Sequence, residues 1–131
     1  MEAALPSNAH NAWVGTRSKA LDQMVSAHQA LGGPAPGRRF ANAQVVHAYA
    51  MLLSSHFQGF CRDLHSETSD HIANGTTPAG AADVLRRLLT AGRKRDSGNP
   101  NPGNIGSDFG RLGFTWAEVI AKDPRNDSRK K

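Results

Sequence analysis

The sequence has very little cysteine and no long hydrophobic run. Its 131 residues include one cysteine, Cys61, so a disulfide framework is excluded and a reducing compartment is favoured. No run approaches the roughly 18 apolar residues of a membrane span, and the N-terminus lacks the apolar core of a signal peptide. We therefore expect a cytoplasmic protein with no membrane partner.

The common motifs of metal and nucleophilic sites are also missing. The six histidines include no HxxxH pair, and His47, His56 and His65 point successively to opposite faces of a helix. There is no CxxC or GxSxG, and the glycines around Gly103–Gly106 lack the lysine and hydroxyl of a phosphate loop. We expect no metal site and no cofactor.

Basic residues outnumber acidic ones. Sixteen Lys and Arg against eleven Asp and Glu give a formal charge of +5, which permits attraction to a polyanion. The excess gathers in short runs: Arg38–Arg39, Arg93–Lys94–Arg95 and Arg129–Lys130–Lys131. Arg93, Lys94 and Arg95 are the candidate RNA-binding residues, and solvated ends of loops are the alternative explanation.

One long stretch, from about Ala41 to about Ile72, organises the chain. It contains no proline, and its apolar residues recur every three or four positions, which predicts a single α-helix about 45 Å long. Such a helix must form the spine of the domain or join two subunits. The residues that make this stripe are Val46, Tyr49, Leu53, Phe57, Phe60 and Leu64.

Shorter helices are predicted on both sides of this stretch. Ser7 or Asn8 caps a helix that ends near Leu31, and Thr115 with Glu118 forms a capping box. Two more helices are expected from Thr77–Pro78 to about Gly92 and from Pro102 to Leu112, separated by the turn-rich segment Asp96–Asn104. The fold class is all-α, a small helical bundle of four to five helices around one long central helix, in a single domain over 1–131.

A polar cluster follows Phe57 and Phe60. Helical spacing places Arg62 and His65 near one face, where histidine could act as an acid or base and arginine could hold a phosphate. Charge pairs on an exposed helix are the alternative. Arg62 and His65 are the candidate catalytic residues.

Two stretches resemble a known family. LLSSHFQGFCRDLHSE (Leu52–Glu67) and DSGNPNPGNIGSDFGRLG (Asp96–Gly113), with AHQALGG and PRNDSRKK, resemble a bacterial branch of the HEPN-type helical domains, near the RiboL-PSP-HEPN group. The resemblance implies an all-α domain that dimerises through its long helix. It also implies a metal-independent endoribonuclease in a toxin–antitoxin or defence setting.

The chain departs from this family at the catalytic motif. The family carries an Arg-x4–6-His motif on a late helix, and no arginine here precedes a histidine at that spacing. We expect the chain to end before the helix that carries the motif, which leaves part of the long helix's apolar stripe uncovered. The expected function is a non-catalytic, dimerising or interacting module of an RNA-targeting family. The alternative is an endoribonuclease or RNA-binding module that uses Arg62 and His65.

Several partners and contact residues follow from these expectations. The expected partner is a second copy or another helical protein, with RNA as a further candidate. The expected dimer-interface residues are Tyr49, Leu53, Phe57, Phe60 and Leu64.

Overall fold

A computed structural model describes residues 7–31 and 39–122, and all of their regular secondary structure is helical. The α-helices are α1 (Asn8–Ala12), α2 (Ser18–Leu31), α3 (Arg39–Asn74), α4 (Ala82–Thr90), α5 (Pro102–Gly110) and α6 (Trp116–Ala121). A π-helical turn (Trp13–Arg17) joins α1 to α2, and 3-10 turns lie at Ala79–Ala81 and Lys94–Asp96. The predicted all-α class and the long helix are confirmed. No helix in the described ranges is long and apolar enough to cross a lipid bilayer.

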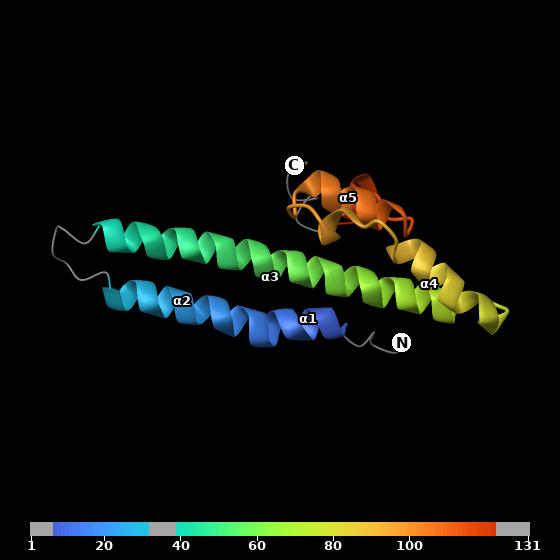
Figure 1. Cartoon of the computed structure of the whole chain (residues 1–131), viewed down its shortest axis with the longest axis horizontal. Coiled ribbons are helices and arrows are strands. Elements are labelled where there is room, and N and C mark those ends of the chain that lie inside the picture. The colour runs from blue at the N-terminus through green and yellow to red at the C-terminus, as the bar shows by residue number, and fades with distance from the viewer. Residues whose placement is uncertain (1–6, 32–38, 123–131) are drawn as a thin grey trace. The chain divides into compact units, whose positions relative to one another are not determined.

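The chain divides into two compact units, Met1–Leu64 and His65–Lys131, with α3 contributing to both. In the first unit, α1 and α2 run antiparallel to α3 (Figure 1). The buried hydrophobic residues described there are Ala9, Leu21 and Cys61. This hairpin therefore buries few side chains fully.

The N-terminal helix begins as the sequence predicts but is not regular throughout. The Ser7 hydroxyl accepts a hydrogen bond from the His10 amide at 3.0 Å, which confirms the cap. The π-helical turn from Trp13 to Arg17 then interrupts the predicted single helix, and the Ser18 hydroxyl donates to the Trp13 carbonyl at 2.7 Å. The Trp13 ring packs on Phe57 and Phe60, with centroids 6.2 and 5.4 Å away. These contacts fix one end of the hairpin.

The predicted start of α4 is wrong. The α4 helix begins after a 3-10 turn, and its N-cap, Ala81, makes no side-chain hydrogen bond, so Thr77 does not cap it. Among the described glycines, Gly92 (60°) and Gly113 (86°) take a positive φ. The backbone therefore reverses after α4 and α5 at glycines, because only glycine adopts this region without a Cβ penalty.

The second unit is tied together by polar side chains. Arg86 on α4 donates to the Asp70 carboxylate at 2.5 Å and to the Asn74 side chain at 3.1 Å. The predicted capping box at α6 is present, with the Thr115 hydroxyl 3.3 Å from the Glu118 amide. The hydrogen bonds from Thr115 lower the pKa of Glu118. The C-terminal segment PRNDSRKK, which is part of the family resemblance, begins at Pro124 and lies outside the described residues. The helices of the described residues follow the predicted order.

Gly106 sets how closely α6 packs on α5. A Cβ at Gly106 would lie 2.4 Å from Nε1 of Trp116, which donates to the Pro102 carbonyl at 3.0 Å. The same atom at Gly110 would meet nothing within 4 Å. The contact with Trp116 therefore requires glycine at position 106, whereas no contact requires glycine at position 110.

We predict opposite effects for alanine at these two positions. Gly110→Ala should stabilise the protein by up to about 1 kcal/mol through helix propensity. Gly106→Ala should displace the Trp116 indole and lose that gain, with a red-shifted Trp116 emission in a Trp13→Phe background. Urea unfolding and fluorescence measure both effects, and equal stabilisation by the two variants would contradict this account of Gly106.

Candidate functional site

An arginine, a histidine and an aspartate meet in the first unit. Nη2 of Arg17, at the end of the π-helical turn, lies 2.6 Å from the Asp63 carboxylate, and Nη1 lies 3.5 Å from Nδ1 of His56. A guanidinium only donates, so His56 accepts at Nδ1 and carries its proton on Nε2. Gly59 makes room, because a Cβ there would lie 2.5 Å from Arg17 Nη1.

This cluster combines residues that can handle a phosphate, but the free ring nitrogen of its histidine is buried, although the Asp63 side chain is 46% exposed. Nε2 of His56 and Nε of Arg17 are buried and make no hydrogen bond to the described residues. The His56 proton therefore does not face a surface where a substrate could meet it. The geometry indicates that Arg17 joins the π-helical turn to α3 through Asp63.

The second unit has a buried ion pair at its centre. Nε of Arg95 lies 2.8 Å from the Asp108 carboxylate, and both side chains are 0% exposed. Asp108 also accepts from the backbone amides of Lys94 (2.7 Å) and Arg95 (3.1 Å). Burial raises the pKa of Asp108, but these hydrogen bonds and the guanidinium outweigh it, so the pKa is lowered overall. The carboxylate thus holds the 3-10 turn against α5.

His65 belongs to the same buried cluster. Its Nε2 lies 3.1 Å from the Asp108 backbone carbonyl, which only accepts, so Nε2 carries the proton. The His65 ring meets the Phe109 ring edge-on, with the two centroids 5.5 Å apart. The Arg95 guanidinium lies 4.7 Å from the centroid of the Phe109 ring. Burial first, and then the positive charge of Arg95, lower the pKa of His65 below 6.5. The histidine is therefore neutral and packed at neutral pH.

The structure gives the two candidate catalytic residues different environments. Arg62 is exposed, whereas His65 is 0% exposed and bonded to the backbone. A substrate that reaches Arg62 in this conformation does not reach the imidazole of His65. Helical spacing predicted that Arg62 and His65 lie near one face of the helix. Spacing alone does not tell which part of that face is buried by the rest of the protein.

The candidate RNA-binding residues are also divided. Arg95 is buried in its ion pair, and Arg93 donates to Ser66 at 2.8 Å and to Asp96 at 3.1 Å. Lys94 is exposed. Two of the three basic side chains are therefore bonded to other residues of the chain. The basic run stabilises the fold and does not form an exposed basic patch.

The predicted dimer-interface residues separate into covered and open positions. Phe57 and Phe60 pack on Trp13, and Leu64 is half-buried. Leu53 remains 37% exposed. Tyr49 lines a cavity between α2 and α3.

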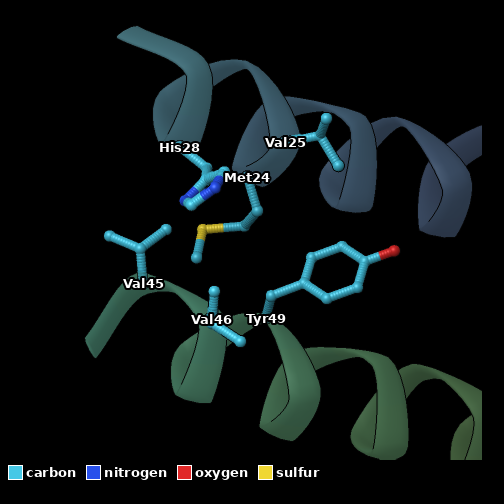
Figure 2. A pocket seen from close by; sticks show the side chains of 6 residues that line it. All are labelled: Met24, Val25, His28, Val45, Val46 and Tyr49. Atoms are coloured by element: carbon cyan, nitrogen blue, oxygen red, sulfur yellow. The ribbon is translucent and has the colours of Figure 1, made fainter. Parts of the chain in front are cut away.

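That cavity has a volume of about 140 Å³ and is almost wholly apolar. Figure 2 shows Met24 reaching from α2 into the space above Val45 and Val46 of α3. Val25, His28 and Tyr49 complete the wall. Val25 (41% exposed) and Val46 (52%) are its most exposed lining residues.

The described residues offer no group of three or more His, Cys, Asp or Glu side chains able to hold a metal ion. No family model, curated protein or solved structure matches the chain. The HEPN-type resemblance and the functions it implies therefore stay predictions.

Sequence reasoning missed Asp108 as the centre of the second unit. One signal was available: Asp108 lies three residues after Ile105 and next to Phe109, on the apolar side of its helix. A carboxylate in that position requires a buried cationic partner. The sequence does not say which of the basic residues supplies it.

We predict that Asp108→Asn costs about 3–5 kcal/mol, because it leaves the Arg95 charge buried without a counter-charge. Asp83→Asn, which removes the partner of an exposed ion pair with Arg86, should cost no more than about 1 kcal/mol. Urea unfolding measures both. Adding Arg95→Met to Asp108→Asn should recover part of the loss, and no recovery would show that the charge is not the cause.

We predict that stability falls as the pH drops below about 6.5, because unfolded His65 then binds a proton that the folded state resists. Wild-type protein should lose more stability between about pH 7.5 and pH 5.5 than His65→Gln does. His71→Gln, at an exposed histidine of the same helix, is the matched control for replacing an imidazole by an amide. An unchanged slope in His65→Gln would contradict the assignment.

Proposed function

We propose that this chain is a non-catalytic helical module that works by association, two copies packing through the open face of the α2–α3 hairpin. The observation that carries the proposal is an exposed and uncharged helical surface. Neither Gln23–Leu31 of α2 nor Asn42–Cys61 of α3 contains an Asp, Glu, Lys or Arg. A helix facing water usually carries charges on its outer side, whereas the cores of protein interfaces are depleted of charge.

The thin core of the hairpin supports the same conclusion. Two helices can bury only one stripe each, and here the exposed apolar side chains Val25, Val46 and Leu53 remain beside the seam. Val46 and Leu53 are separated by two helical turns and lie on one stripe of α3. A second hairpin laid on this face would bury them and complete a four-helix arrangement.

The alternative of an endoribonuclease or RNA-binding module has weaker support. Phosphate recognition relies on Lys and Arg, which the segments Gln23–Leu31 and Asn42–Cys61 lack, and the His65 imidazole is buried. In terms of the HEPN-type resemblance, the chain would be a non-catalytic member of an RNA-targeting group. Any contact with RNA would then use exposed basic residues such as Arg62 and Lys94.

A charge placed on the open face tests the proposal. We predict that the wild-type chain is a dimer in light scattering and that Leu53→Asp makes it monomeric, because a carboxylate would be buried without a partner. Met51→Asp is the control: Met51 is 74% exposed and lies about 200° around the helix from Leu53. A monomeric wild type would sink the proposal, and an equal effect of both variants would place the interface elsewhere.

A further inference from the structure

The described side chains of the hairpin line the cavity between α2 and α3 without filling it. We infer that it receives the Leu53 side chain of a second copy, and that the reverse contact forms at the same time across a two-fold axis near Ala50. This inference rests on the proposed function and adds the register and direction of the interface. The cavity is complete only when the second copy contributes its leucine.

The walls of the cavity suit an aliphatic side chain. Met24, Val45 and Tyr49 are its less exposed lining residues, and Val25 and Val46 are its most exposed ones. Its volume of about 140 Å³ is close to that of apolar cavities that bind a small hydrocarbon. An aliphatic group that entered the cavity would replace water with apolar contacts.

Leu53 is the side chain best placed to enter. It lies seven residues after Val46, so it shares that stripe of α3 and stands about 10 Å farther along the helix. The neighbouring large side chains are engaged elsewhere: Phe57 and Phe60 pack on Trp13, and Met51 lies on the opposite side. Leu53 is 37% exposed and free to fill a hole.

A two-fold axis between the cavity and Leu53 gives both contacts at once. In an isologous interface, if residue i of one copy meets residue j of the other, then j also meets i. An axis near Ala50, perpendicular to α3, sets the two α3 helices antiparallel and brings each Leu53 to the other copy's Val46. A parallel arrangement would instead place Leu53 against Leu53.

The absence of charge favours a second copy as the occupant. A partner selected by acidic or basic groups would need complementary charges on this face, and the described hairpin has none between Asn42 and Cys61. The charge-free segment Asn42–Cys61 of α3 meets the same segment of a second copy without like-charge repulsion. The fit of an apolar side chain into the cavity, and not charge, therefore selects how the two copies pair.

Cysteine pairing between two differently tagged chains tests the register. In a Cys61→Ala background, chains with Val46→Cys and chains with Leu53→Cys are mixed under mild oxidation. We expect a disulfide between the two kinds of chain and little within either kind, because the like positions lie about 10 Å apart, beyond the reach of a disulfide. Leu53→Cys pairing with itself would overturn the antiparallel register.

Light scattering on the same samples separates the two proposals. A monomer would overturn both, whereas a dimer without the Val46–Leu53 disulfide would overturn only the register. Leu53→Ala should raise the dimer dissociation constant at least about tenfold, since each dimer buries two leucines. Met51→Ala should leave it within about twofold, and equal effects of the two alanine variants would contradict the inference.

Discussion

A long helix must have its apolar side covered, and this constraint governs the first unit. The α3 helix has 36 residues and is therefore about 54 Å long. Trp13 covers Phe57 and Phe60, and Met24 reaches toward Val45, but Val46 and Leu53 stay open. Trp13 covers α3 near Phe60. Farther toward the start of α3, the cavity and the exposed Leu53 remain.

The second unit solves the problem of burial in another way. Its largest fully buried side chains are Arg95, His65, Asp108 and Ser69, while Ala73 and Ile105 are its buried hydrophobic residues. A core of this kind depends on complete pairing, because an isolated charge in it is costly. Asp108 meets this demand by accepting from two backbone amides and one guanidinium. Geometry, more than apolar area, therefore specifies how α5 packs on the turn before it.

Periodicity and capping chemistry predicted most of the helices, since these signals are local. The cap at Ser7, the long helix and the box at Thr115 and Glu118 are confirmed. The start of α4 was predicted wrongly, because the Thr77–Pro78 signal fits a turn before the helix as well as its first residue. The roles of the polar residues could not be read locally: Arg95 and His65 have the composition of a surface site, and only their partners far along the chain reveal burial.

The uncharged hairpin face has a consequence for how copies would meet. Charges on an interface steer two molecules toward the correct orientation before they touch, and their absence leaves association near the unsteered range of roughly 10⁵–10⁶ M⁻¹s⁻¹. Two hairpins that collide here would carry no long-range information about direction or register. The choice between antiparallel and parallel pairing would be made after contact, while the helices slide, by whether a side chain finds the hollow beside Met24.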